Sequence, residues 1–359
     1  MSRDRLRVAV VYGGRSSEHG ISCVSAGGIL RALDPAKYQV AAIGITPAGA
    51  WYAQPADPDA LVIVDGVLLD LRATGHPLVI SADPALAADF AGGVDVVFPV
   101  LHGPWGEDGT VQGLLEMAGI PYVGSGVLAS ALAMDKGPMK AMLRSAGLQV
   151  AAYTTISDRD WQVDPAGCID AALGLGLPCF VKPARAGSSI GISKVTEAAA
   201  MQAAIEQAQA HDPKVIIEAS VEFAREIECG VMTDTAGRPI ASRCAEIIVR
   251  GDHAFYDFAA KYLEDAADLV LPADLDPSLE AEVQRQAMAA FEALGCEGLA
   301  RVDFFISSDG TVLVNEVNTM PGFTPISMFP RMWQASGWSY PDLVEHLVLD
   351  ALRRGSGLR

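Results

Sequence analysis

The sequence RVDFFISSDGTVLVNEVN, residues 301–318, holds two short runs of β-branched and aromatic residues on either side of Ser307–Gly310. A polar segment ending in glycine between two such runs predicts a hairpin of two antiparallel strands. Side chains alternate between the two faces of a strand, so valines and phenylalanines fill one face. The polar residues on the other face are Arg301, Asp303, Glu316 and Asn318.

The expected register brings these polar residues into one cluster. Pairing of Ile306 with Thr311 across the turn places Arg301 opposite Glu316, with Asp303 diagonally across. Grouped oxygen ligands suit Mg²⁺ that carries a polyphosphate, and an arginine suits a developing negative charge. The alternative is a solvated face of a hairpin that binds no ligand.

Length and charge limit the class of protein. With 359 residues the chain is too long for one ordinary core, so we expect two or three domains. A formal net charge of −18 argues against nucleic acid or an anionic membrane as partner. The sequence shows no signal peptide and no apolar run of membrane-spanning length, which predicts a cytoplasmic protein.

The first part of the chain has the pattern of a doubly wound α/β domain. Buried strands are predicted at Leu6–Tyr12 and Val94–Val100, and a helix at Ser22–Leu33. Gly13-Gly14 follow the first strand, but the G-x-G-x-x-G motif is incomplete. This disfavours the alternative of a nicotinamide-dependent oxidoreductase.

A glycine-rich segment, residues 184–191, lies between two strand-like runs in the middle of the chain. It is no Walker loop, because no Gly-Lys-Ser/Thr opens a helix, but its backbone N–H groups can fold over phosphates. Lys182 ends the preceding strand, where a lysine packs poorly, which favours a phosphate partner. A flexible loop without a ligand is the alternative.

Helices are predicted in two further places. A methionine- and alanine-rich helix contains Asp135-Lys136, and an amphipathic helix covers Leu279–Leu294. The last residues, Arg353 to Arg359, are expected to fray.

In this order, the segments resemble the D-alanine–D-alanine ligases, a family of ATP-grasp carboxylate–amine ligases. Each motif is weak alone, and the joint order over nearly the whole chain is specific. The matching motifs are Gly13–His19, His102–Gly109, Met134–Lys136, Val181–Ser189, Arg225–Glu228, Tyr256–Asp257, Lys261–Tyr262, Arg301–Asp303, Asn315–Asn318 and Pro321–Ser327.

The resemblance implies an α/β (α+β) ATP-grasp fold of three domains that grips ATP between the second and third. The implied domains are a doubly wound α/β domain at 1–125, a central subdomain with the phosphate loop at 126–219, and a C-terminal subdomain with the metal site and a substrate-closing loop at 220–359. It also implies a homodimer.

The resemblance further implies an ATP site with two Mg²⁺ ions, for which Mn²⁺ can substitute. The residues implied to bind ATP are Lys136, Lys182, Ser189, Glu218, Val221, Glu226 and Lys261. The implied metal ligands are Asp303, Glu316 and Asn318.

Two D-alanine sites are implied as well. Glu18 takes the ammonium of the first D-alanine, and Ser327 with the Met328 backbone takes the carboxylate of the second. Arg301 and the Gly322 N–H form the oxyanion hole. The remaining implied residues are His102 in the substrate crevice, and Ser188 and Tyr262, which link the loops that close the site.

The implied reaction joins two D-alanines through an acyl phosphate, yielding ADP and phosphate, for peptidoglycan precursors. A carboxylate is a poor electrophile, so phosphorylation activates it, and closure must exclude water. Two alternatives remain: a ligase that takes D-lactate or D-serine second, and a catalytically silent nucleotide-binding module.

Overall fold

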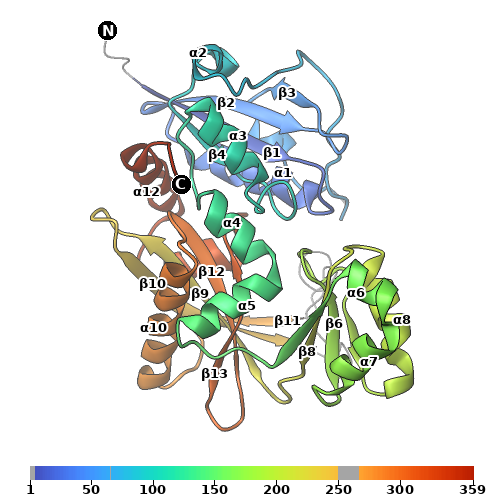
Figure 1. The fold of residues 1–359 in the computed structure, drawn as a ribbon. Helices are drawn as coiled ribbons and strands as arrows, with labels where there is room; N and C mark the ends of the chain where they lie inside the picture. Colours follow the sequence, from blue (N-terminus) through green and yellow to red (C-terminus); the bar gives the residue numbers. More distant parts are fainter. Residues whose placement is uncertain (1–4, 65, 250–266) are drawn as a thin grey trace.

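The structure, a computed structural model, describes residues 5–64, 66–249 and 267–359, and within these residues the strands form three sheets. Figure 1 shows the sheet of the N-terminal part at one end of the molecule and the other two sheets at the opposite end. None of the helices in the described ranges is long and apolar enough to cross a membrane.

The first sheet belongs to the N-terminal part of the chain. Its elements are β1 (Leu6–Gly13), α1 (His19–Ala32), β2 (Tyr38–Ile45), β3 (Trp51–Gln54), η1 (Pro58–Ala60), α2 (Pro84–Ala87), η2 (Phe90–Gly92), β4 (Val96–Pro99) and α3 (Thr110–Ala118). The strand order is β3-β2-β1-β4, parallel except for β3. In β1, Val8 and Val10 pack in the same core as α1, whereas Ala9 and Val11 pack with α3. Helices on both faces confirm the doubly wound arrangement.

The second sheet is antiparallel and has the order β5-β8-β6-β7. Its elements are β5 (Tyr153–Ile156), α6 (Asp158–Val163), α7 (Pro165–Leu173), β6 (Cys179–Pro183), β7 (Ser193–Val195), η3 (Ala198–Ala200), α8 (Met201–Gln209) and β8 (Val215–Ala219). Buried and partly buried residues alternate along β6, since one face packs on α7 and α8. Lys182 therefore lies on the face of the sheet turned away from these helices.

The third sheet has the order β11-β10-β9-β12-β13. Its elements are β9 (Arg225–Thr233), β10 (Pro239–Val249), β11 (Ala267–Val270), α10 (Pro277–Ala293), β12 (Leu299–Ile306), β13 (Val312–Asn318) and α11 (Met328–Ala335). The amphipathic helix predicted at Leu279–Leu294 is confirmed as α10, which packs its buried Val283 and Phe291 against this sheet.

The predicted hairpin of β12 and β13 is confirmed, but its predicted register is wrong. The observed pairs are Arg301 with Asn318, Asp303 with Glu316, Phe304 with Val314, and Ile306 with Val312. The turn is one residue longer than expected, and a bulge makes Asn315 an extra residue in β13. Asn315 and Glu316 therefore both leave the core face, and Glu316 lies directly across from Asp303.

The single helix predicted around Asp135-Lys136 is two helices. They are α4 (Val127–Met134) and α5 (Lys136–Ser145). Asp135 breaks the run, because its extended backbone caps α5 and its side chain accepts a hydrogen bond from the Gly137 N–H. Lys136 thereby becomes the first residue of α5.

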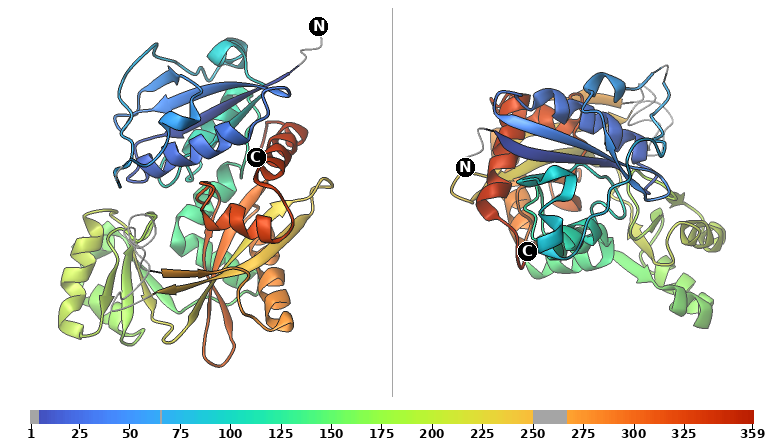
Figure 2. Two further views of the ribbon diagram at one scale, coloured as in Figure 1. Left: turned by 180° about the vertical axis from the view of Figure 1, so that it is seen from behind. Right: turned by 90° about the horizontal axis from the view of Figure 1, so that it is seen from above.

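The last helix, α12 (Tyr340–Arg354), returns to the first sheet. Its Leu343, Val344 and Leu347 share one core with Val8 and Val10 of β1. Figure 2 shows the C-terminal end of the chain against the N-terminal part in both views.

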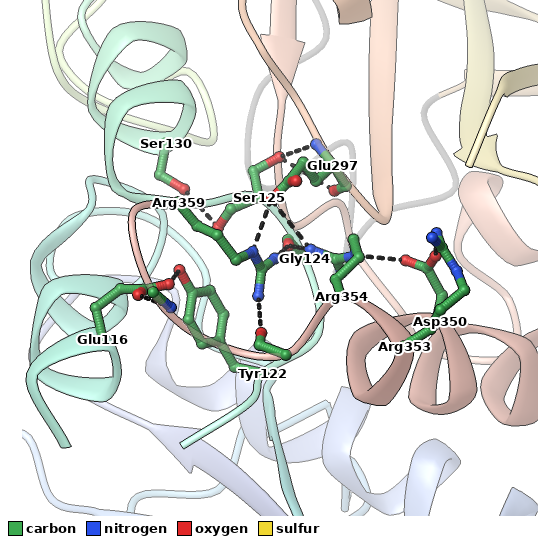
Figure 3. A network of polar contacts seen from close by, with 12 residues as sticks. Glu116, Tyr122, Gly124, Ser125, Ser130, Glu297, Asp350, Arg353, Arg354 and Arg359 are labelled. Carbon is green, nitrogen blue, oxygen red and sulfur yellow. Dashed lines mark hydrogen bonds and ion pairs between the residues drawn. The ribbon is translucent and has the colours of Figure 1, made fainter. Parts of the chain in front are cut away.

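The expectation that residues 353–359 fray is wrong. Arg354 and Arg359 both bind the Gly124 carbonyl oxygen and the Glu297 carboxylate (Figure 3). The Arg359 guanidinium also lies 4.4 Å from the ring centre of Tyr122. This network fixes the end of the described chain.

Candidate active site

Two adjoining cavities lie between the sheets. The first, about 400 Å³, is bounded by the loop after β6, the connection from β8 to β9, and β12 with β13. The second, about 640 Å³, lies between α1, the loop after β4 and the segment that follows β13. Gly187, Ser188, Glu228 and Glu316 line both. The cavities are two halves of one cleft.

Buried lysines surround Glu218 behind the first cavity. Lys182 Nζ donates to Glu218 Oε2 at 3.0 Å, and Lys140 Nζ lies 3.4 Å from Oε1. Burial acts to raise the pKa of Glu218, but Lys140 and Lys182 outweigh it, so the pKa is lowered. Burial lowers the pKa of Lys140, whose side chain is fully buried and also donates to the Asn315 carbonyl at 2.9 Å.

The glycine-rich loop closes over the boundary between the two cavities. Lys136 Nζ donates to the Ala186 carbonyl at 2.9 Å, and Ser188 Oγ donates to Glu18 Oε1. A Cβ on Gly187 would lie 2.6 Å from Glu18 Oε2, so a larger residue here would displace the Glu18 carboxylate. Glu18 is therefore enclosed between α1 and the loop.

Arg301 and Asp303 form a paired contact in the third sheet. Arg301 donates to both carboxylate oxygens of Asp303 at 2.7 Å and lies 3.4 Å from Glu228. Burial acts to lower the pKa of Arg301, but Asp303 and Glu228 outweigh it, so the guanidinium stays charged.

The predicted metal ligands are brought together. Asn318 Nδ2 donates to Asp303 Oδ2 at 3.1 Å, and Glu316 faces Asp303 across the hairpin, 3.5 Å from Lys136 Nζ. The described residues contain no group of three His, Cys, Asp or Glu that could hold a metal alone. Two carboxylates and an amide fit a hard cation that takes its remaining oxygen ligands from phosphate or water.

The segment after β13 offers backbone N–H groups to the second cavity. Gly322 lines this cavity, and its N–H makes no hydrogen bond within the described chain. Ser327 is the N-cap of α11, and Met328 is its first residue; both line the same cavity. A helix N-terminus favours an anion.

The remaining predicted site residues line one of the two cavities, except for two that the structure does not describe. Ser189, Val221 and Glu226 line the first cavity, and His102 lines the second. Lys261 and Tyr262 lie outside the described residues.

Sequence reasoning missed several residues around the cleft. They are Ser25, Glu107, Lys140 and Glu228. Glu107 and Glu228 lie inside two of the motifs that carry the family resemblance, His102–Gly109 and Arg225–Glu228. A carboxylate in a glycine-rich loop, as at Glu107, or on an apolar strand, as at Glu228, could have indicated a functional residue. Ser25 and Lys140 lie in helical segments that carry no such signal.

A glycine-rich loop and lysines that face an acidic antiparallel hairpin across a cleft define the ATP-grasp ligases. Solved structures share the whole architecture. The D-alanine–D-alanine ligase from Coxiella burnetii is 34% identical with a TM-score of 0.82, covering 98% of this chain and 95% of that one. The VanG D-Ala:D-Ser ligase from Enterococcus faecalis is 34% identical with a TM-score of 0.83, covering 97% and 99%.

Sequence comparisons narrow the class to one family. The model for the D-ala D-ala ligase N-terminus matches residues 7–125, and that for the C-terminus matches residues 142–349. A D-alanine–D-alanine ligase from Mycobacterium sp. (strain KMS) is 53% identical over 371 residues, covering 99% of this chain and 98% of the relative. One from Streptomyces avermitilis is 52% identical over 372 residues, covering 98% and 96%. The chain belongs to the D-alanine–D-alanine ligase family, whose members are ATP-dependent ligases acting on small molecules.

Proposed function

We propose that this chain joins two D-alanine molecules to D-alanyl-D-alanine, with cleavage of ATP to ADP and phosphate by phosphoryl transfer to the first carboxylate, for peptidoglycan precursors. The observation that carries the proposal is the divided cleft. One half presents lysines and an acidic hairpin, and the other presents a free backbone N–H beside a helix N-terminus. Full-length relatives at 53% identity support D-alanine as the second substrate.

ATP occupies the first cavity in this proposal. Lys136 and Lys182 neutralise phosphate oxygens beneath the glycine-rich loop, whose Ser189 hydroxyl and backbone N–H groups add donors. Glu218, held by its lysines, takes the adenine amino group together with the backbone near Val221, and Glu226 takes the ribose hydroxyls. Lys261 is assigned to the γ-phosphate by resemblance alone.

Asp303, Glu316 and Asn318 would hold two Mg²⁺ ions, or Mn²⁺ in their place. Bound there, the ions would neutralise the charge that crowds the γ-phosphate during its transfer. Each Asp303 oxygen has a second lone pair, so Asp303 could bind a cation while it still accepts from Arg301 and holds the guanidinium beside the reacting carbonyl.

The amino acids occupy the second cavity. Glu18 binds the ammonium of the first D-alanine, whose carboxylate becomes an acyl phosphate. The amine of the second D-alanine attacks that acyl carbon, while its carboxylate is held by Ser327 and the Met328 N–H. The bond between the acyl carbon and the phosphate oxygen then breaks, and the phosphate leaves with the bonding electrons and takes up the proton that the amine loses. Arg301 and the Gly322 N–H stabilise the tetrahedral oxyanion. Ser188, with Tyr262 by resemblance, keeps the loops closed against water.

The organisation of the protein is part of the proposal. We assign three domains at 1–125, 126–219 and 220–359, a cytoplasmic location and a homodimer. The net charge of −18 supports small-molecule partners over nucleic acid or membranes.

The test measures phosphate release from Mg-ATP with D-alanine alone, and then with limiting D-alanine plus excess D-lactate or D-serine. We expect turnover with D-alanine alone and D-alanyl-D-alanine as product. Turnover that requires D-lactate or D-serine would contradict the substrate assignment. Tight ATP binding without amino-acid-dependent hydrolysis would contradict catalysis.

A further inference from the structure

The turn that carries Gly322 is held from outside by three polar side chains. Met320 N–H donates to Glu107 Oε2 at 3.2 Å, and the Met320 carbonyl lies 2.9 Å from His102 Nδ1. Phe323 N–H donates to Ser25 Oγ at 3.3 Å. These contacts bracket Gly322 on both sides, and Pro321 has no N–H.

The tautomer of His102 follows from these contacts. Nδ1 faces a carbonyl oxygen, so it must carry the proton, and burial lowers the pKa of this ring, which keeps it neutral. Nε2 is then an acceptor for the Ser25 hydroxyl at 3.1 Å. Ser25 is fully buried, and its oxygen lone pair is left to accept the Phe323 N–H. The direction of every hydrogen bond in this chain, from the Met320 carbonyl through His102 and Ser25 to the Phe323 N–H, is therefore fixed.

Glu107 holds the other end of the turn. Its Oε1 accepts the Gly103 N–H at 2.6 Å, and its Oε2 accepts the Met320 N–H. Because His102 and Glu107 belong to one loop, that loop binds both the carbonyl and the N–H of Met320. The backbone of this residue therefore cannot rotate without breaking one of the two contacts.

We propose that Ser25, His102 and Glu107, the turn clamp, are positioning residues that aim the Gly322 N–H at the reacting carbonyl. Of the N–H groups at residues 320–323, that of Gly322 alone makes no hydrogen bond within the described chain, and Gly322 lines the second cavity. The inference rests on the proposed oxyanion role of Gly322. It assigns His102 to the turn, since both ring nitrogens bind protein atoms, rather than to direct contact with substrate.

Ser25→Ala tests the clamp, with Ser22→Ala as the matched control. Ser22 lies one helical turn earlier on α1, is equally buried, and bonds the Gly13 N–H and Val100 carbonyl of the first sheet. Phosphate and D-alanyl-D-alanine are measured in the same reaction. Loss of an oxyanion donor lowers turnover about 100- to 1,000-fold, so its misalignment should lower kcat at least about 10-fold.

The ratio of the two products separates positioning from folding. If oxyanion stabilisation is lost in the second step, the acyl phosphate persists longer and is hydrolysed by water. The Ser25→Ala variant should therefore release more phosphate than dipeptide. Its KM for ATP should stay within about 2-fold of the wild-type value. Glu107→Gln should do the same, because its amide can accept only one of the two N–H bonds. The Ser22→Ala control should make phosphate and dipeptide in equal amounts, as the wild-type chain does.

Three results would overturn the clamp. The first is that Ser25→Ala and Glu107→Gln keep the wild-type kcat and make phosphate and dipeptide in equal amounts. The second is that both products fall in parallel with thermal stability. The third is that Ser22→Ala releases the same excess of phosphate over dipeptide as Ser25→Ala. A wild-type chain that makes no dipeptide would instead overturn the proposed function itself.

Discussion

Glu316 is the residue on which the metal assignment depends most. It lies across from Asp303, lines both cavities, and lies near Lys136. A carboxylate in this place can bind a cation shared with phosphate, whereas the isosteric amide lacks the charge.

Glu316→Gln should fold normally and lose at least about 1,000-fold in turnover, since phosphoryl transfer depends on charge neutralisation. Phosphate release measures the loss of turnover, and thermal unfolding checks that the variant folds normally. Glu206→Gln, on α8 and bonded to Gln202, is the matched control and should retain full activity. An active Glu316→Gln would remove this residue from the metal site.

His102 should make stability depend on pH. Its pKa in the folded chain lies below the ordinary 6.5, because burial lowers it and Arg301 adds to this while Glu18 opposes it. Below pH 6.5 the unfolded chain binds the extra proton, so stability falls by up to about 1.4 kcal/mol per pH unit until the folded pKa is reached.

Urea unfolding at pH 7 and pH 5 measures this loss. His102→Asn keeps a donor near the position of Nδ1 but cannot titrate, so its stability should fall less between the two values. An equal fall in both proteins would contradict the burial of a neutral imidazole.

Residue types alone pointed to Arg301, Asp303, Glu316 and Lys182, because charged groups on apolar strands stand out. The roles of Lys136, Glu218 and Glu226 came only from the family resemblance. Ser25 and Glu107 did not stand out, since their partners in the Met320–Phe323 turn are more than 200 residues away. Such a contact has no local pattern.

At the scale of elements, the bulge in β13 shapes the acidic face. The extra residue Asn315 has its carbonyl bound by Lys140, which comes from α5. Lys140 thus connects the third sheet to Glu218 of the second. The cleft depends on this buried link between elements.

Lys140→Met should lower the free energy of unfolding by about 3–5 kcal/mol, the usual cost of breaking a buried ion pair. It should also raise KM for ATP, because Glu218 and the bulge lose their common partner. Urea unfolding and initial rates measure both effects. Lys37→Met removes an exposed pair with Glu345 and is the control expected to change neither. Equal effects in the two variants would contradict the structural role of Lys140.

The hairpin itself was predictable from alternating residues around a polar turn, but its register was not. Turn length and bulges depend on the neighbouring strand and on Lys140, which local sequence does not reveal. The break at Asp135 was missed although Gly137 and Pro138 follow it closely. Both residue types are unfavourable in a helix interior, whereas proline is tolerated in the first turn of a new helix.

At the scale of the whole molecule, the end of the described chain joins parts that are far apart in sequence. Arg354 binds Asp350 at 2.7 Å, Glu297 at 3.2 Å and the Gly124 carbonyl at 3.3 Å (Figure 3). The core of α12 with β1 lies beside it. The first and third sheets are therefore held together near Gly124.

Arg354→Met should lower the free energy of unfolding by about 3 kcal/mol, because Asp350 and Glu297 lose a buried partner. Arg353 also binds Asp350 and limits the loss. Arg285→Met breaks only an exposed contact with Glu282 and should leave the urea midpoint unchanged. A midpoint that stays the same in both would show that the network is dispensable.

The sequence predicted β1, α1 and β4 and the doubly wound class of the N-terminal part, whereas β2, β3 and the strand order were not predicted. The family resemblance implied the ATP-grasp architecture of the rest. The sequence did not predict that α12 packs on the first sheet or that Arg359 is anchored. Both contacts join residues that lie more than 230 positions apart in the sequence. The local sequence pattern near residue 359 therefore could not predict them.

Gly187 and Ser188 form part of the wall of both cavities. A ligand that moves this loop changes the affinity of the other cavity whenever the ligand of that cavity binds the two loop positions differently. Thermodynamic reciprocity then requires the two changes in affinity to be equal. If D-alanine tightens ATP binding about tenfold, ATP tightens D-alanine binding by the same factor. The apparent affinity of an inhibitor that binds in the second cavity should therefore depend on the nucleotide concentration.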